Sequence, residues 1–431
     1  MEARSDSVFL QATKAWHRRL AWLPTLYVLR GVPYVAMLSL VPIILNRMGL
    51  SNGLNVFCCS WAMLPLIFRP LLGKLTRGLT DCRTLILLAE LLMGLLTIGM
   101  GEVLRMKVWL PLFLLLFYLS ALVAAVHDVG AARYFMICSE RRPHQHVLPV
   151  RMGAFCVALV GALGVPAMLG GNLEVVARRV PHAWSTVATL MGAGILLLSV
   201  YHGLVMPRLG EQVVRKRTPY LRLLADDFRN FAGRRYFRYE VLFLLLFLLP
   251  EGFFYRVGIL FLIDPGSNGG LSLSPQEVAF VQGTVGAFGV LLGCLLGVRC
   301  VHYQGFRYWL WPMTMALVFP KVFYVFMGYT LTTSLGLISV SVFLEQMGFG
   351  FGVMAFVAYL AYLSRGYHPV MFYSYCFAIA AAAVMLSGAL SGYVADYLGY
   401  RHFFIFLMLL GVVPFFAAAL VRTEPIEGLK L

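Results

Sequence analysis

The sequence predicts an all-α membrane protein with about twelve transmembrane helices in two six-helix halves. Composition is the first reason. Of 431 residues, 60% are hydrophobic and 13% are charged, whereas a soluble domain is nearer half apolar and a quarter charged. The second reason is a series of apolar runs, each close to the ~20 residues that a helix needs to cross a bilayer. A soluble enzyme, a disordered chain and a disulfide-stapled secreted domain are all excluded.

The apolar runs fall into two groups of six on either side of a polar stretch. This organisation predicts a first half at 1–206, a basic linker at 207–238 and a second half at 239–431. The predicted spans are 20–46, 53–73, 84–101, 108–132, 150–171, 183–206, 239–263, 276–298, 307–328, 332–363, 369–395 and 401–421.

The basic residues indicate topology. The net charge is +16, from 35 Lys+Arg and 19 Asp+Glu. Twenty-five of the basic residues lie in the two terminal segments and in the loops on the same side of the membrane as the N-terminus. Nine of these are in 207–238. Six lie in the opposite loops and four within spans. Because basic loops stay on the cytoplasmic side, both termini are predicted to be cytoplasmic, and the pI needs no nucleic-acid partner.

The linker contains a candidate amphipathic helix at 219–231. Apolar and charged side chains recur there at helical spacing, which predicts a helix lying in the membrane interface and attracted by anionic lipid. A solvated loop with some helix is the alternative. The residues in this pattern are Leu221, Leu224, Phe228 and Phe231 beside Arg222, Asp226 and Arg229.

Catalytic and metal-binding patterns are missing from the sequence. The eight cysteines fall mostly in apolar runs without a CxxC spacing, so we expect them to behave as small buried hydrophobic residues. No GxSxG, HExxH or GxxxxGK[ST] string occurs. We therefore predict no enzyme activity, metal site or cofactor. The pair His127-Asp128 alone is compatible with a membrane acyltransferase, but such an enzyme does not need two matched halves.

Six spans on either side of a basic loop is the layout of the major facilitator superfamily, whose halves are parallel repeats. Short strings echo between the halves at the equivalent spans. Span 1 contains Arg30-Gly31 with a tyrosine three residues after the glycine, and span 7 contains Glu251-Gly252 with a tyrosine at the same spacing. Spans 4 and 10 each contain a polar pair followed two residues later by glycine, at 127–130 and 345–348.

A more specific resemblance runs along nearly the whole chain. The sequence resembles the AmpG-type permeases, in particular their Bacteroidetes-type versions, and acetyl-coenzyme A transporters are more distant relatives. The strings that carry it are 31–34 (GVPY), 69–73 (RPLLG), 125–130 (AVHDVG), 261–265 (FLIDP), 269–271 (GGL), 283–286 (GTVG), 309–313 (WLWPM), 345–350 (EQMGFG), 391–393 (SGY) and 399–400 (GY).

The resemblance implies a function. The family imports muropeptides, which are 1,6-anhydro-muramyl sugars carrying a short peptide, through the bacterial inner membrane for cell-wall recycling, driven by the proton gradient. Three polar positions depart from similar sequences, which tend to have an acidic residue at Arg30, an Asp near Ala132 and an Asn at Lys321. Two of these changes add a cation, so they bear on the substrate and on the coupling group.

Ionisable residues within spans usually face the bundle interior, so they are the candidate site. Their near balance in sign predicts mutual pairing, since a buried charge is costly without a partner. The anions are Glu90, Asp128, Glu251 and Glu345, and the cations are Arg30, Arg69, Arg256 and Lys321.

Spans 1 and 7 line the central cavity of this fold. Arg30 and Glu251 are therefore predicted to form either a substrate and gating site or a structural salt bridge that joins the halves. Tyr34 and Tyr255 are candidates for stacking on a sugar ring. Arg256 follows Glu251 by five positions, about 140° around a helix, so we expect it to have another partner.

Proton coupling needs a buried carboxyl group. We assign it to Glu345 or Asp128, with a satisfied interhelical hydrogen bond as the alternative. Gln346 joins the predicted substrate site beside Glu345. His127 is predicted either to relay protons or to cap a helix end.

The remaining charges have more structural assignments. Lys321 either binds an anionic substrate or neutralises Glu345. Arg69 is predicted to form a gate or loop contact, and Glu90 a structural contact. Alternate glycines in 348–352 should let helix backbones approach closely.

The sequence thus predicts a proton-coupled secondary transporter, expected to be a monomer, for an anhydro-muropeptide or a related amino-sugar/peptide. Transport of small peptides or of another organic anion, including acyl-coenzyme A, is the alternative, and a non-transporting membrane sensor is a further one.

Overall fold

The computed structural model describes residues 19–139, 147–209, 220–365 and 369–422, and all regular secondary structure in these ranges is helical. The first half consists of α2 (Arg19–Val35), η1 (Ala36–Leu40), α3 (Val41–Arg47), α4 (Asn52–Trp61), α5 (Leu64–Ile67), α6 (Arg69–Arg77), α7 (Cys82–Val103), α8 (Trp109–Ser139), α9 (Val147–Leu159), η2 (Val160–Gly164), α10 (Val165–Ala177) and α11 (Val180–Val205). Helix α12 (Tyr220–Ala232) follows. The second half consists of α13 (Phe237–Leu246), α14 (Leu249–Ile263), η3 (Gly266–Asn268), α15 (Pro275–Val278), η4 (Ala279–Val285), α16 (Gly286–Gln304), α17 (Phe306–Val318), η5 (Phe319–Lys321), α18 (Val322–Thr330), α19 (Leu335–Leu363), α20 (Pro369–Leu410) and α21 (Val412–Ala419).

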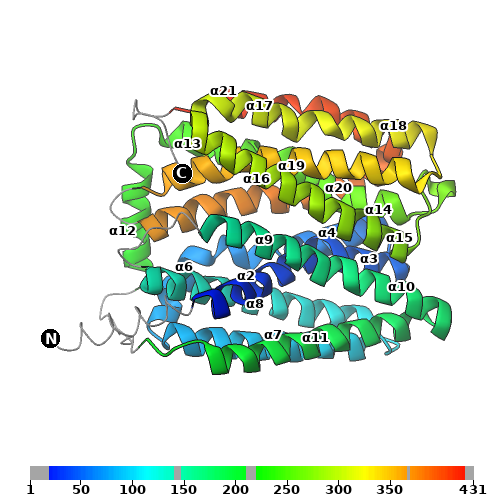
Figure 1. The fold of residues 1–431 in the computed structure, drawn as a ribbon, viewed down its shortest axis with the longest axis horizontal. Helices are drawn as coiled ribbons and strands as arrows, with labels where there is room; N and C mark the ends of the chain where they lie inside the picture. The colour runs from blue at the N-terminus through cyan, green and yellow to red at the C-terminus, as the bar shows by residue number, and fades with distance from the viewer. Residues whose placement is uncertain (1–18, 140–146, 210–219, 366–368, 423–431) are drawn as a thin grey trace.

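The described helices account for twelve spans. Ten helical segments are long and apolar enough to cross a membrane, and Asn52–Ile67 with Arg69–Arg77 forms one more span with a bend of 48°. The segment Pro369–Ala419 has 51 residues and would span about 76 Å as one straight helix at 1.5 Å per residue, far more than one crossing requires. It is interrupted at Gly399 (φ 71°), a conformation that favours glycine, and there the chain turns back along the bundle (Figure 1). The predicted fold class is therefore confirmed.

Helix α12 lies across one end of the bundle (Figure 1), which we call the α12 end. It covers the stretch in which the sequence pattern predicts an amphipathic helix. Phe231 is fully buried and stacks on Tyr375 of α20, while Asp227 pairs with Lys74 of α6 at 2.6 Å. The tyrosine hydroxyl donates a hydrogen bond to the carbonyl oxygen of Leu224. Helix α12 therefore contacts both halves.

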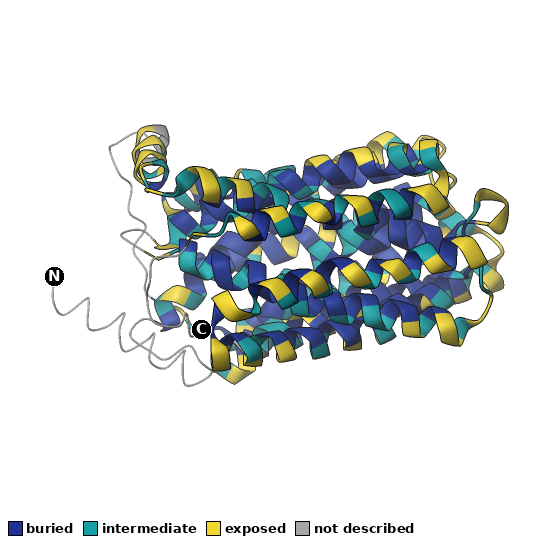
Figure 2. Cartoon of the chain, turned by 90° about the horizontal axis from the view of Figure 1, so that it is seen from above, coloured by how far each residue is buried: buried dark blue, intermediate teal, exposed yellow. Residues whose placement is uncertain are grey.

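The exterior of the bundle is apolar. Exposed residues alternate with buried ones along each long helix (Figure 2), and many of the exposed side chains are large and hydrophobic, such as Leu88, Leu92 and Leu95 on α7. A continuous apolar exterior is expected where lipid is the solvent. All eight cysteines are free, and seven of them are buried, which confirms their predicted role as small hydrophobic residues.

Two pairs of spans bring the backbones of the halves into close contact. Helix α4 packs on α20, where Gly392 lies against the backbone of Asn52 and Gly53. The π-helical segments η2 and η4 form the other contact, and a Cβ atom on Gly283 would lie only 2.5 Å from the Cα atom of Gly164. Glycine at these positions permits direct backbone contact between the halves.

The alternate glycines of α19 behave as predicted. A Cβ atom on Gly348 would lie 2.3 Å from the carbonyl oxygen of Ala316 on α17, and one on Gly350 would lie 2.4 Å from that of Val290 on α16. Helix α19 is thus held closely on two sides, which fixes the direction of Glu345 and Gln346 just before these glycines.

Candidate functional site

Three charged side chains of the first half form what we call the Asp128 cluster: Arg30 on α2, Arg69 at the start of α6 and Asp128 on α8. The Arg30 guanidinium donates a hydrogen bond from Nε to Asp128 Oδ1. Arg69 Nη1 lies 2.8 Å from Asp128 Oδ2. The side chains are 4 to 12% exposed. Two guanidinium groups share one carboxylate, so the cluster has a formal charge of +1.

The bend in span 2 positions Arg69. Helices α5 and α6 each begin with a proline in their first turn, and proline breaks the helical hydrogen-bond ladder. The new helix therefore starts at Arg69, whose guanidinium carbon lies 5.2 Å from the ring centre of Tyr373 and 4.9 Å from that of Phe377. Both rings belong to α20, so Arg69 connects the Asp128 cluster to the second half through cation–π contacts.

Tyr34 lies beside the same cluster. It packs against a small apolar cluster of Leu66, Ala125 and Ala381, which includes residues of both halves, and its buried hydroxyl has no hydrogen-bond partner among the described residues. A buried hydroxyl usually has a partner, so this group is available to a ligand.

The second half contains the Glu251 cluster, formed by Glu251 on α14, Lys321 at the end of η5, and Glu345 with Gln346 on α19. Lys321 Nζ donates hydrogen bonds to Glu251 Oε1 and, at 2.7 Å, to the carbonyl oxygen of Leu317. The short 3₁₀ turn at Pro320 interrupts the α-helical hydrogen bonds and leaves the Leu317 carbonyl oxygen free to accept from the lysine. Glu345 Oε2 accepts a hydrogen bond from Gln346 Nε2 at 2.8 Å. With both carboxyl groups ionised, the formal charge is −1.

The structure places the predicted partners differently. Arg30 and Glu251 do not pair with each other, because each is held by a charge of its own half. Lys321 forms its ion pair with Glu251 and not with Glu345. The alternative of a structural Arg30–Glu251 salt bridge is therefore wrong for this conformation, whereas the alternative of a substrate and gating site stays a prediction.

Arg256, on α14, has no carboxylate partner among the described residues. It is 0% exposed, and its Nε and Nη1 atoms have no hydrogen-bond partner. Its Nη2 atom is 3.5 Å from the carbonyl oxygen of Cys59 and 3.3 Å from the sulfur of Met63, both in span 2. The expectation that Arg256 has a partner other than Glu251 is thus confirmed, although that partner is a carbonyl oxygen and a sulfur and not a carboxylate. A buried unpaired guanidinium is costly, which indicates a role outside this conformation.

Tyr255 lies next to Arg256 and contacts the first half. Its hydroxyl oxygen is 3.4 Å from Ser39 Oγ of η1, and its ring packs near Phe349 of α19. The segment 251–256 therefore presents a carboxylate, a phenol and a guanidinium to different neighbours near the contact between the halves.

Glu90 belongs to a third group, the Glu90 cluster, formed with His127 and His202. Its Oε1 atom is 3.1 Å from His127 Nε2 and 2.8 Å from His202 Nδ1 of α11. All three side chains are essentially fully buried. His127 does not cap a helix end, because α8 continues to Ser139. His202 is absent from the predicted site, although a histidine inside an apolar run is a usable signal of a buried polar group.

The halves also meet at the end opposite α12, through the Asp264 cluster. Asp264 follows α14, and its carboxylate accepts hydrogen bonds from Asn46 at 2.7 Å, from Asn52 at 2.6 Å and from the hydroxyl of Tyr400 at 2.6 Å. Asp396 Oδ2 accepts a hydrogen bond from the backbone N–H of Gly53 at 2.8 Å nearby. Donors of the first half and acceptors of the second therefore close this end.

Replacing Asp264 by alanine should loosen that closure. The change leaves two amides and a phenol without their common acceptor, so buried Cys59 of α4 should react faster with a soluble maleimide. The measurement is the labelling rate of purified protein in which the other seven cysteines are alanine. The control is Glu102→Ala, which removes an exposed carboxylate at the end of α7. Equal rates in both variants would contradict a closing role.

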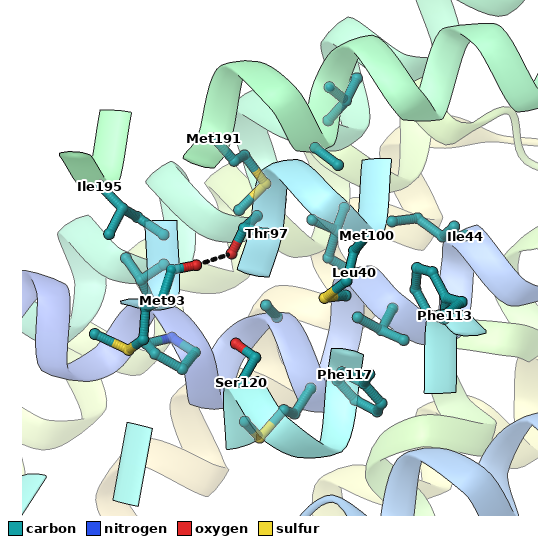
Figure 3. A pocket seen from close by; sticks show the side chains of 17 residues that line it. Leu40, Ile44, Met93, Thr97, Met100, Phe113, Phe117, Ser120, Met191 and Ile195 are labelled. Carbon is teal, nitrogen blue, oxygen red and sulfur yellow. Dashed lines mark hydrogen bonds between the residues drawn. The ribbon is translucent and has the colours of Figure 1, made fainter. Parts of the chain in front are cut away.

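A small cavity of about 60 Å³ lies within the first half, between α2, η1, α7, α8 and α11 (Figure 3). Its lining is almost entirely apolar, with Met93, Met191 and Phe113 among the residues, and the hydroxyl of Thr97 is already bonded to the Met93 carbonyl oxygen at 2.7 Å. It offers nothing to orient a charged ligand. In the described ranges, no group of three His, Cys, Asp or Glu residues is arranged to hold a metal ion.

Several solved transporter structures share this architecture. That of the nucleoside transporter NupG has a TM-score of 0.66 at 13% identity and covers 94% of this chain and 99% of its own. The inward-open xylose transporter XylE from E. coli gives 0.66 at 14% identity, with 95% and 98% covered. A D-xylose-proton symporter gives 0.60 at 15% identity, with 96% of both chains covered. No family model and no curated protein matches the sequence. The chain is an integral membrane protein with the fold of the major facilitator superfamily.

Proposed function

We propose that this protein is a proton-coupled secondary transporter that imports an anhydro-muropeptide or a related amino-sugar/peptide by alternating access. One observation carries the proposal: two buried carboxyl groups, Glu251 and Glu345, lie with a single ammonium, Lys321, in a fold shared with transporters. Glu251 has the lysine as its partner, whereas Glu345 has a neutral amide. An unpaired carboxylate in the bilayer interior is costly, and a bound proton removes that cost. Glu345 is therefore the proton carrier that we propose.

The unpaired cations favour an anionic substrate. Arg256 has no counter-ion among the described residues, and the Asp128 cluster carries one positive charge in excess. A muropeptide supplies carboxylates that a guanidinium fork binds through charge-assisted hydrogen bonds. Its sugar ring would stack on Tyr255 or Tyr34, and Gln346 would bind its amides. Another organic anion would satisfy the same cations, so the substrate assignment rests further on the resemblance of the sequence to the AmpG-type permeases.

Two groups of contacts, which join the halves at different places, support alternating access. The Asp264 cluster joins them at the end opposite α12, and Arg69 joins them through α20. The proposed cycle breaks the first set while substrate enters and the second while substrate leaves. The basic loops assign the α12 end to the cytoplasm in this proposal.

Uptake into proteoliposomes tests the function. With an imposed inward proton gradient, labelled anhydro-muropeptide should accumulate above equilibrium, and collapsing the gradient should remove the accumulation. Glu345→Gln should abolish gradient-driven accumulation but retain exchange of external for internal substrate, because only proton carriage is lost. Asp226→Asn, an exposed carboxylate of α12, serves as the control. Substrate binding without uptake of any cell-wall fragment, peptide or organic anion would instead favour a sensor.

A further inference from the structure

The Glu90 cluster is the end of a hydrogen-bond chain that crosses four spans. His202 Nε2 lies 3.0 Å from Thr25 Oγ1 on α2, and that hydroxyl lies 3.2 Å from the carbonyl oxygen of Trp22. The other imidazole nitrogen, Nδ1, reaches Glu90 on α7, which also binds His127 on α8. The chain thus connects α2, α11, α7 and α8 in the interior of the first half.

The charges of the Glu90 cluster do not balance when its three groups are in their ordinary forms at neutral pH. With Glu90 ionised and both histidines neutral, the cluster has a charge of −1. In the described part of the chain, the ion-pair partners of Glu90 are His127 and His202 alone. An uncompensated anion in such surroundings is costly, and one added proton removes that cost.

Two arrangements hold that proton with every ring contact satisfied. In the first, His202 is an imidazolium that donates to Glu90 and to Thr25, and the threonine hydroxyl donates onward to the Trp22 carbonyl. In the second, Glu90 is a carboxylic acid that donates to His127 while His202 donates to Glu90. Both arrangements are neutral overall, and both lose the same proton to give the anionic cluster.

We infer that Glu90, His127 and His202 form a proton-binding site in the first half, distinct from the carboxyl groups of the Glu251 cluster. The ligand is a single proton shared by one carboxylate and two imidazoles. Other charged groups on the same or adjacent packed elements are already engaged. They include Arg83 of α7, which donates to the carbonyl oxygens of Gly203 and Met206, Arg133 of α8, which donates to the carbonyl oxygen of Thr80, and Asp128 of α8 with its partners Arg30 and Arg69.

The proton site lies close in sequence to the Asp128 cluster. His127 directly precedes Asp128, and Arg30 follows Thr25 by little more than one turn of α2. Loss of the proton would put a negative charge next to the Asp128 cluster, which holds the Arg69 contact with Tyr373 of the second half. Proton binding in the first half would thereby alter a contact between the halves.

Infrared difference spectroscopy of the purified protein during a pH titration tests this inference. The wild type should show a titrating band of a carboxyl group or an imidazole ring that disappears in Glu90→Gln and in His202→Gln. The control is His182→Gln, which changes an exposed histidine on the same helix, α11, and should keep the band.

Two variants, Glu90→Gln and His202→Gln, each test the inference independently. Should Glu90→Gln fail to elute as a folded monodisperse species, His202→Gln carries the comparison, because its side-chain amide still donates to Glu90. A wild-type titration that both variants reproduce in full would overturn the inference. The experiment contains no substrate, so failure of the proposed transport function would leave its result unchanged.

Discussion

Lys321→Met should destabilise the folded protein by about 3–5 kcal/mol, the usual cost of breaking a buried ion pair from one side. Methionine approximates the shape of the lysine stem but removes the ammonium that binds Glu251 and the Leu317 carbonyl oxygen. The carboxylate then remains buried beside Glu345 without any compensating charge. The measurement is the thermal unfolding midpoint of the detergent-purified protein, followed by the loss of monodisperse elution.

Two further variants separate charge from packing. The double variant Lys321→Met/Glu251→Gln removes both charges and should recover most of the lost stability, since a matched pair of neutral groups leaves nothing uncompensated. Arg47→Met breaks an ion pair with Glu174 whose arginine is 37% exposed, and it should cost at most about 1 kcal/mol. A single Lys321→Met variant as stable as the wild type would show that the pair is not formed.

Arg256→Met should not destabilise the substrate-free protein. No described carboxylate loses a partner in this variant, so stability should stay the same or increase. Substrate binding should weaken by about 10- to 100-fold, the loss expected for a hydrogen bond to a charged group. The measurement is the shift in unfolding midpoint with increasing muropeptide, in the wild type and in the variant.

Arg30→Met is the matched control, because its guanidinium pairs with Asp128 and its removal should lower stability. If Arg256→Met were as unstable as Arg30→Met, the Arg256 guanidinium would be a structural element. If it were stable and still bound muropeptide normally, Arg256 would not bind the anion.

Hydropathy predicts the span architecture well, because the length of an apolar run that crosses the membrane depends on the thickness of the bilayer. The ion-pair partners of the buried charges were harder to predict. The echo between Arg30 and Glu251 predicted that these positions correspond between the repeats, but corresponding positions need not touch. Each instead lies near the span 4 or span 10 charge of its own half, and Lys321 enters the second cluster through the turn at Pro320.

Two other features depended on information that the sequence does not contain. The isolation of Arg256 follows from side-chain directions in three packed spans, which spacing along one helix does not give. The Glu90 cluster needed His202, whose 112-residue separation from Glu90 hides their contact in any local pattern.

The backbone contact between Gly164 and Gly283 has a mechanical consequence. The two backbones are in direct contact at that point, so a rotation of one half against the other meets no interlocking side chains there. Contacts further from this point, such as Asp264 with Asn52 and Arg69 with Tyr373, move through longer arcs and must break. The glycine pair is therefore suited to act as the pivot of the rotation. The polar contacts farther from it determine which end of the bundle opens.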